Sequence, residues 1–330
     1  MIYPWQTKDF SRLVSLDSKL PHALLILGRQ GIGKFEFALS LTSALLCEQR
    51  LGDGKQCGVC PACRWFERGN HPDFRLVQPD ALTQEPDGEA GEGKKKSEQI
   101  RIDQVRDLQD FLTVGTHRAG RRVIVVHPAD TMNAATQNAL LKSLEEPAPG
   151  TIFLVVTSQP HRLLPTVRSR CQVVELPLPF HDAATNWLRE QGVREPDRLL
   201  AFAGGAPLAA LENANFEEFR GGFVRGLTQP GLDPMAFAES CQQLKPVLVV
   251  DWLQRWAYDL LRSKLGAAPR YHLSEEKALS EIAARCNARA IGSFLKNLAS
   301  ARALSSHPLN TRLFFEDLFF QYCRVIESPD

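Results

Sequence analysis

The chain has 330 residues, of which 44% are hydrophobic and 23% are charged, and its formal net charge is +1 at pH 7. This length and apolar content suffice for two or three domains with buried cores. The balanced charge excludes a strongly basic protein that holds nucleic acid by its overall field, so any DNA contact must be local or shared with partners. No apolar run approaches the ~20 residues that span a bilayer, and the first residues lack a signal pattern, so we expect a cytoplasmic protein.

A phosphate-binding loop lies near the N-terminus. The apolar run Ala23–Leu27 predicts a buried strand, and a helical pattern covers residues 34–49. Between them lies the pattern G-x-x-x-x-G-K, in which backbone N–H groups and a lysine bind phosphate, with Gly28, Gly31, Gly33 and Lys34 as its residues. The next position should hold a Ser or Thr hydroxyl that binds Mg²⁺, but Phe35 stands there. Because this ligand is missing, we expect weak or no nucleotide binding and no hydrolysis.

Four of the eight cysteines lie at the end of this helix and just after it with the spacing C-x9-C-x2-C-x2-C, and they are Cys47, Cys57, Cys60 and Cys63. In a reducing cytosol such clusters bind metal more often than they form disulfides, and four thiolates suit a closed, tetrahedral zinc site. A bacterial iron–sulfur pattern would need a cysteine near Glu67. His71 is an alternative to Cys47 as the fourth ligand. We therefore predict a structural zinc ion.

The alternation of strands and helices continues after the cysteines. Phe74–Val77 predicts a strand, and residues 102–112 predict a helix. The segment between them, residues 80–99, is rich in Pro, Gly, Glu and Lys and is too polar to pack. We expect this segment to be a disordered surface insertion.

A second defect follows the strand predicted at residues 123–126. In P-loop ATPases a strand of this type ends in acidic residues that hold the metal and polarise water. Here it runs into His127 and Pro128, and neither suits a magnesium site built from oxygen ligands. We expect Asp130 to cap a helix over residues 132–146 rather than to bind metal. Two defects in one site favour a protein without ATPase activity over a weakened ATPase.

The predicted core ends with strands at residues 152–157 and 173–176. Its alternating pattern predicts an α/β fold over residues 1–176, with a parallel sheet flanked by helices. Beyond this point the strand signals stop. Residues 177–215 predict a linker and a small helical domain, with helical patterns at 182–191, 196–203 and 207–213. Residues 216–330 predict an all-α domain, with amphipathic stretches at 247–265, 275–303 and 311–326.

Several of these features occur together, and in this order, in one known family. They are residues 20–23 before the loop, the cysteine module, the run at 139–147 and the triplet at 169–171. Because of these features, the first 176 residues resemble the AAA+ subunits of sliding-clamp loaders. The degraded nucleotide site and the short helical C-terminal part resemble those of the delta-prime family of bacterial DNA polymerase III. The resemblance implies an AAA+ P-loop core, a small helical lid domain and an all-α collar domain that joins other subunits.

The resemblance also implies roles for single residues. Arg170, in the triplet Ser169-Arg170-Cys171, corresponds to an arginine that enters the ATP site of a neighbouring subunit and stabilises charge on the transferring phosphoryl group. Outside this family, the same arginine would be interpreted as part of a surface ion pair. Thr157 takes the position of a polar sensor. Ala209 stands where active relatives carry an arginine, which implies a third loss from the nucleotide site.

These features together imply a non-hydrolysing structural subunit of the clamp loader of the replicative DNA polymerase. The implied partners are the ATPase motor and delta subunits of a hetero-pentamer, and, through that complex, the sliding clamp and primer–template DNA. One alternative is a slow or divergent clamp-loader ATPase that binds Mg·ATP through Lys34 and a substitute acid. Another is an unrelated zinc-dependent nucleic-acid-binding module, which the balanced charge supports poorly.

Overall fold

The computed structural model describes residues 2–83, 96–117, 120–305 and 310–327. The chain forms two compact units, Met1–Ala183 and Ala184–Asp330. The three-part division expected from the sequence stays a prediction.

The first unit is built on a five-stranded parallel sheet with the strand order β2-β3-β4-β1-β5. The strands are β1 (Ala23–Leu27), β2 (Phe74–Val77), β3 (Arg122–Val126), β4 (Thr151–Thr157) and β5 (Gln172–Glu175). All residues of β3 and β4 are buried, as expected for central parallel strands covered on both faces. The predicted parallel sheet is therefore confirmed, with strand boundaries that differ by one residue at most.

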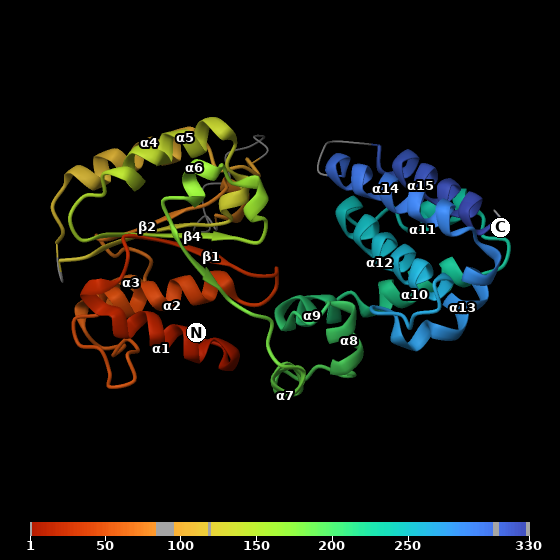
Figure 1. Ribbon diagram of the computed structural model, residues 1–330, viewed down its shortest axis with the longest axis horizontal. Coiled ribbons are helices and arrows are strands. Elements are labelled where there is room, and N and C mark those ends of the chain that lie inside the picture. Colours follow the sequence, from red (N-terminus) through yellow and green to blue (C-terminus); the bar gives the residue numbers. More distant parts are fainter. Residues whose placement is uncertain (1, 84–95, 118–119, 306–309, 328–330) are drawn as a thin grey trace. The chain divides into compact units, whose positions relative to one another are not determined.

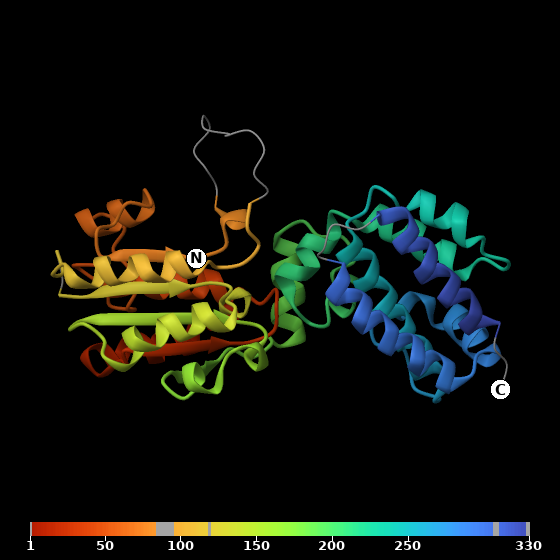
Figure 2. The ribbon, with the colours of Figure 1, turned by 90° about the horizontal axis from the view of Figure 1, so that it is seen from above.

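Helices cover both faces of this sheet, and Figure 1 shows the two layers on opposite sides of it. One layer contains α1 (Thr7–Leu16), α2 (Lys34–Leu46) and α3 (Pro61–Glu67), and the other contains α4 (Ile102–Thr113), α5 (Ala134–Glu145) and α6 (Pro165–Arg168). Seen from above, α4 and α5 lie along the strands (Figure 2). Their apolar sides share one core with β3 and β4, in which Leu140, Leu144 and Val155 are fully buried.

The start of α5 corrects one prediction from the sequence. Asp130 does not cap this helix, because it lies in a separate 3-10 turn, Ala129–Thr131. The cap is Asn133, whose side-chain oxygen accepts a hydrogen bond of 2.9 Å from the backbone N–H of Thr136. The helix begins at Ala134 because the N-cap oxygen must lie two or three residues before the N–H that it accepts. Asp130 is thereby left for a contact inside the unit.

The polar segment at residues 80–99 is fixed at both of its described ends. Asp80–Leu82 forms a 3-10 turn, and the backbone N–H of Ala81 donates to the carbonyl of Ser97 over 3.0 Å. Residues 84–95, which make up most of the insertion predicted to be disordered, lie outside the described residues.

The second unit contains helices and, within its described residues, no strand. Its helices are α7 (His181–Glu190, which begins in the first unit), α8 (Pro196–Phe202), α9 (Pro207–Ala214), α10 (Glu217–Thr228), α11 (Pro234–Ser240), α12 (Pro246–Lys264), α13 (Glu276–Arg285), α14 (Ala288–Leu304) and α15 (Thr311–Ile326). The core between α10 and α15 is rich in aromatic residues. At its centre the indole N–H of Trp256 donates to the Tyr322 hydroxyl over 3.0 Å, and that hydroxyl donates to the carbonyl of Leu227.

The amphipathic stretch predicted at residues 275–303 is interrupted in the structure. It forms α13 and α14, which are separated at Cys286 and Asn287. The side-chain oxygen of Asn287 accepts a hydrogen bond of 2.8 Å from the N–H of Arg289 and so caps α14. Cys286 is buried, so the apolar pattern continues across the break between the two helices. The break therefore cannot be recognised from the periodicity of the sequence.

Candidate functional site

The loop predicted to bind phosphate joins β1 to α2 at the edge of the sheet where the parallel strands end. In the sheet register Leu27 pairs with Thr157, and Val126 pairs with Val155 on the same central strand. The residues that follow β1 and β3 therefore lie beside the last residue of β4. The structure thus brings the P-loop, His127 and Thr157 to one edge.

The N-terminal segment covers the outer side of this loop. The indole N–H of Trp5 and the amide of Gln6 donate to the carbonyl of Ile32 over 3.0 and 2.9 Å, and Gln6 also donates to the carbonyl of Gly33 over 2.8 Å. The ring of Tyr3 lies so close to Gly33 that a Cβ there would be 2.4 Å from it. A side chain at this position is excluded for a second reason, since its φ is +86°.

Sequence reasoning missed this cover. The one hint of it in the sequence is the pair of aromatic residues Tyr3 and Trp5 near the first residue. In the structure their ring centroids are 4.9 Å apart and the rings are stacked. Their contribution to the site is to satisfy and shape the backbone of the loop.

Lys34 points its ammonium group back into the loop. The residue is only 6% exposed, and Nζ donates to the carbonyl of Arg29 over 2.7 Å. Burial lowers the pKa of Lys34 to about 8, against the opposing effect of the Asp130 and Glu36 carboxylates. The lysine thus remains at the position from which it could contact an anion, and at present its charge is satisfied within the chain.

Phe35 and His127 form an aromatic stack where a P-loop ATPase keeps its metal ligands. Their ring centroids are 4.4 Å apart and the planes differ by 13°. Burial, together with the charge of Lys34, lowers the pKa of His127 to about 4, although Asp130 opposes this shift. The imidazole is therefore neutral at pH 7, and its Nδ1 has no hydrogen-bond partner in the described part of the chain. This stack offers no oxygen ligand for Mg²⁺.

The carboxylate of Asp130, which acts electrostatically on His127, is already engaged in a hydrogen bond. Asp130 is 8% exposed and accepts a hydrogen bond from the hydroxyl of Thr157. The same hydroxyl oxygen accepts the backbone N–H of Gln159 over 2.9 Å. Thr157, at the position of the polar sensor, and Asp130, the acid that could replace a metal ligand, thus both have hydrogen-bond partners within the unit.

Arg170 lies on the turn between α6 and β5. Its Nη1 donates to the carbonyl of Thr166 over 2.8 Å, and its Nη2 forms an ion pair with Oε1 of Glu145. About a third of the side chain, 34%, is exposed. The surface ion pair that the sequence offered as the ordinary interpretation is present, and about a third of the side chain remains accessible.

The neighbours of Arg170 hold the turn in place. The Ser169 hydroxyl donates to the carbonyl of Thr166 over 3.1 Å. Cys171 is buried in the core beside α5, and burial raises its pKa to about 11. A thiol in this state is not a nucleophile at neutral pH.

The four clustered cysteines lie at the end of α2 and the start of α3. Their sulfur atoms are all within 4.8 Å of one another, and those of Cys47 and Cys60 are 4.0 Å apart. Tetrahedral zinc with Zn–S bonds of ~2.3 Å places its sulfur ligands about 3.8 Å apart, so this arrangement fits such an ion. The N–H groups of Val59 and Cys60 lower the pKa of Cys57 to about 6, which favours a thiolate. The cluster could hold a metal such as zinc.

His71 is not part of this cluster. Its Nδ1 accepts the backbone N–H of Asp73 over 3.1 Å, and the group of possible ligands within the described residues consists of the four cysteines. The alternative with His71 in place of Cys47 is therefore not favoured.

Ala209, the last residue with an implied role, lies in α9 of the second unit. It packs half-buried against the small core of α7 to α9 and contributes no charge.

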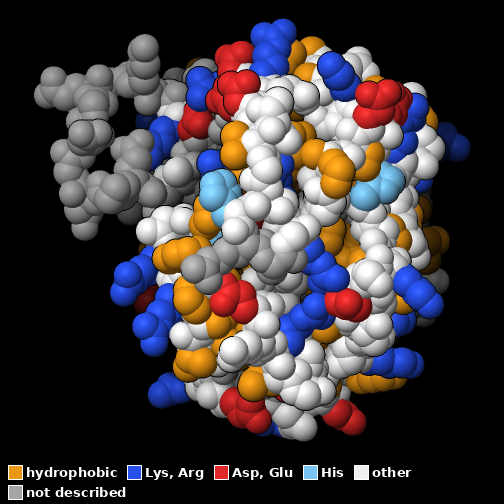
Figure 3. Space-filling model, turned by 90° about the vertical axis from the view of Figure 1, so that its left-hand side faces the viewer, with side chains coloured by type: hydrophobic (Ala, Val, Ile, Leu, Met, Phe, Trp, Pro, Cys, Tyr) orange, Lys and Arg blue, Asp and Glu red, His pale blue; other side chains and the backbone are white. Residues whose placement is uncertain are grey.

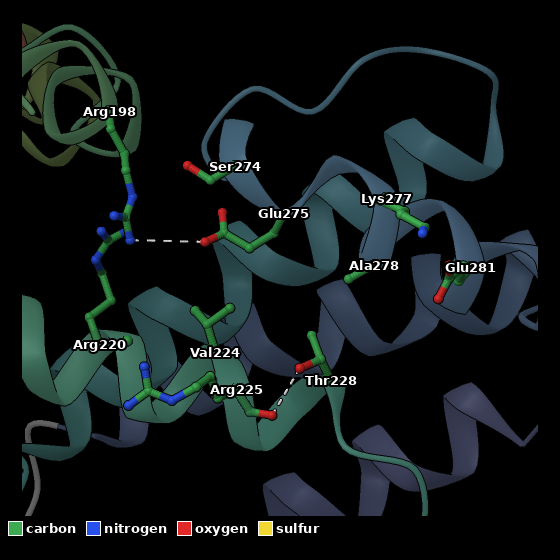
Figure 4. Close-up of a pocket in the computed structure, with 11 residues that line it drawn as sticks. Arg198, Arg220, Val224, Arg225, Thr228, Ser274, Glu275, Lys277, Ala278 and Glu281 are labelled. Atoms are coloured by element: carbon green, nitrogen blue, oxygen red, sulfur yellow. Dashed lines mark hydrogen bonds and ion pairs between the residues drawn. The ribbon is translucent and has the colours of Figure 1, made fainter.

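A separate cleft of about 500 Å³ lies in the second unit and contains none of the predicted site residues. Figure 4 shows that Arg198, Arg220 and Glu275 point toward one another across it. Arg220 also pairs with Glu217 over 2.6 Å. The buried charge of Arg220 is thus paired within the second unit, as are the charges of Arg198 and Glu275.

Basic and acidic side chains are interspersed on the face of the molecule in Figure 3, in agreement with the balanced net charge. No helix among the described residues is long and apolar enough to cross a membrane.

Comparison with known proteins identifies the family. A family model described as "DNA polymerase III, delta subunit" matches residues 5–179, which is more than half of the chain. DNA polymerase III subunit delta' of Pseudomonas aeruginosa is 37% identical over 80% of this chain and 78% of its own length. The subunit delta' of Escherichia coli is 29% identical over 97% of this chain and 94% of its own length.

A solved structure, of a DNA polymerase III gamma subunit-related protein from Thermotoga maritima, is similar over 97% of this chain and 99% of that chain, with a TM-score of 0.48 and 18% identity. The family model and the Pseudomonas relative agree with the resemblance found in the sequence. The chain belongs to the delta-prime subunit family of DNA polymerase III.

Proposed function

We propose that this chain is a subunit of the sliding-clamp loader of the replicative DNA polymerase and that it does not hydrolyse ATP. Membership of the delta-prime family supports the first part. The observation that carries the second part is the stack of Phe35 on His127, at two positions where hydrolysing relatives need metal-binding oxygen atoms.

The rest of the nucleotide site supports the same proposal. The hydroxyl of Thr157 donates to Asp130 and accepts the N–H of Gln159, so this sensor position is already engaged within the unit. Gly28, Gly31 and Lys34 keep the features that bind phosphate. We therefore propose weak or absent nucleotide binding, without turnover.

We further propose that Arg170 acts in the ATP site of a neighbouring motor subunit. Its backbone is fixed between the buried residues Val167 and Cys171, while its side chain is partly exposed. An arginine supplied in this way raises the rate of GTP hydrolysis by about 10³–10⁵ in GTPases, because it stabilises the charge of the transition state. In this account the chain completes a catalytic site that it does not itself contain.

The four cysteines are proposed to bind a structural zinc ion. They link the C-terminal end of α2 to the first turn of α3, at a point where the chain is otherwise irregular. With four thiolate ligands the metal has no open position, so it stabilises the fold and takes no part in chemistry.

The second unit is proposed to form the lid and the collar through which the subunits associate. Leu313 and Phe320, seven residues apart on α15, are 60% and 43% exposed and lie on one face of that helix. An apolar face of this kind supports a role in subunit association. The partners would be the ATPase motor and delta subunits, with the clamp and primer–template DNA reached through the complex, in the cytoplasm.

The test of non-hydrolysis compares the purified chain with its Lys34→Ala variant. We expect neither protein to hydrolyse ATP, with or without Mg²⁺. Hydrolysis by the wild type that is lost in the variant would establish the alternative of a slow ATPase. A matched control is Lys19→Ala, because Lys19 lies in the 3-10 turn before β1, whereas the loop follows the other end of that strand.

A further inference from the structure

Glu145 occupies a position that is electrostatically unfavourable for a carboxylate. It is the last residue of α5, where the unpaired backbone carbonyls carry partial negative charge. The preceding residue, Leu144, is 1% exposed and anchors this end of the helix in the core. A cation beside this carboxylate, in addition to Lys142 in the same last turn, therefore stabilises this end of the helix.

Arg170 supplies that cation from a different part of the chain. Its Nη2 pairs with Oε1 of Glu145, while its Nη1 donates to the carbonyl of Thr166 over 2.8 Å. Val167 and Cys171 lie in the same core cluster as Leu144. The two residues of the pair are thus mounted on one packed core, so the pair restricts the guanidinium to a narrow range of positions.

The ion pair with Glu145 leaves some N–H donors of the Arg170 guanidinium unpaired among the described residues. Arginine has five N–H donors, and the two contacts above occupy one on each terminal nitrogen. The three others have no hydrogen-bond partner among the residues that the structure describes. With 34% of the Arg170 side chain and 47% of the Glu145 side chain exposed, a phosphoryl group could reach the free donors.

We infer that Glu145 is a positioning residue for Arg170: it holds the guanidinium in one rotamer before the ATP of a neighbouring subunit is engaged. The inference rests on the proposed role of Arg170. It extends that role to a residue that contacts neither nucleotide nor metal in this account. Preorganisation of this kind lowers the entropy lost when the guanidinium meets the transferring phosphoryl group.

The experiment uses the complete clamp loader, assembled so that only the ATP site facing this chain is active. The variants are Glu145→Gln, Arg170→Ala and the double variant, with Glu146→Gln as the matched control because Glu146 is the adjacent exposed carboxylate. Single-turnover rates, kcat, KM for ATP and assembly by size-exclusion chromatography are measured for each. Thermal unfolding of the isolated chain checks that each variant folds.

For Glu145→Gln we expect kcat to fall between about fivefold and thirtyfold, with unchanged KM and assembly. The lower figure corresponds to an exposed ion pair, and the upper one to the full rotamer entropy of an arginine side chain. Glu146→Gln should match the wild type. In the Arg170→Ala background, Glu145→Gln should cause no further loss, because a positioning residue acts only through the group that it positions.

The outcomes separate this inference from the proposed function. If Arg170→Ala leaves the rate unchanged, the finger assignment is wrong and the inference fails with it. If Arg170→Ala lowers the rate but Glu145→Gln equals the wild type, the finger stands and the positioning role is wrong. A rate increase in Glu145→Gln, or a loss that persists in the Arg170→Ala background, also overturns the positioning role.

Discussion

Loss of one cysteine of the cluster should remove the metal and lower the stability of the first unit. Replacing Cys60 by Ser removes one sulfur from the group within 4.8 Å and should abolish tight zinc binding. Ser keeps the N-cap position of α3, where Cys60 accepts the N–H of Cys63, so the helix itself should remain. The expected damage is therefore the loss of the metal link.

That link closes the loop between Cys47 and Cys63. A covalent cross-link over a loop of this length contributes about 3 kcal/mol through the entropy of the unfolded chain. A metal held by four thiolates should contribute at least a similar amount, since its binding free energy adds to folding. We expect the free energy of unfolding of the first unit to fall by about 3 kcal/mol or more.

The assay combines metal analysis with urea unfolding at matched pH. Wild type should contain one zinc per chain, and a strong chelator should reproduce the destabilisation of Cys60→Ser. Cys323→Ser, a half-buried cysteine outside the cluster, is the control and should keep its zinc. A metal-free wild-type protein with unchanged stability would refute the reasoning.

Two further predictions concern the edge of the sheet near the phosphate-binding loop. Gln6→Ala should destabilise the first unit by about 2 kcal/mol in urea unfolding, because it removes two hydrogen bonds that each contribute about 1 kcal/mol. The carbonyl of Ile32 keeps its bond from Trp5, and that of Gly33 keeps its bond from the N–H of Phe37. Gln30→Ala on the exposed part of the loop should change little. The free energy of unfolding should also fall as the pH drops from about 6.5 toward 4, and the loss should reach about 2 kcal/mol between pH 7 and pH 5. The reason is that His127 binds a proton in this range when the chain is unfolded but stays neutral when it is folded. His127→Asn should lack this part of the pH dependence, and identical pH profiles for variant and wild type would contradict the assignment.

Much of the first unit follows from local patterns in the sequence. The strands β1 to β5 are short apolar runs, and their spacing by helices leaves a parallel sheet as the simplest arrangement. The cysteine cluster was predictable because metal-ligand spacing is itself a geometric constraint. In both cases the signal lies within a few residues of the chain.

Other features depend on contacts between distant residues. The cover of Gly33 by Tyr3 and the pairing of Glu145 with Arg170 join segments that no local pattern connects. The prediction for Asp130 failed for a related reason: its acidic side chain suits a helix cap, but its hydrogen bond to Thr157 forms only once β4 is in the sheet. Propensity is a weak guide where tertiary contacts compete with it.

The most direct test of the whole account is the rate of ATP hydrolysis at the site facing Arg170, measured in the assembled loader with clamp and primed DNA. We expect the isolated chain to be inactive and Arg170→Ala to lower this rate by about 10³-fold or more without disturbing assembly. An isolated chain that hydrolyses ATP, or an Arg170→Ala complex that turns over at the wild-type rate, would contradict this expectation.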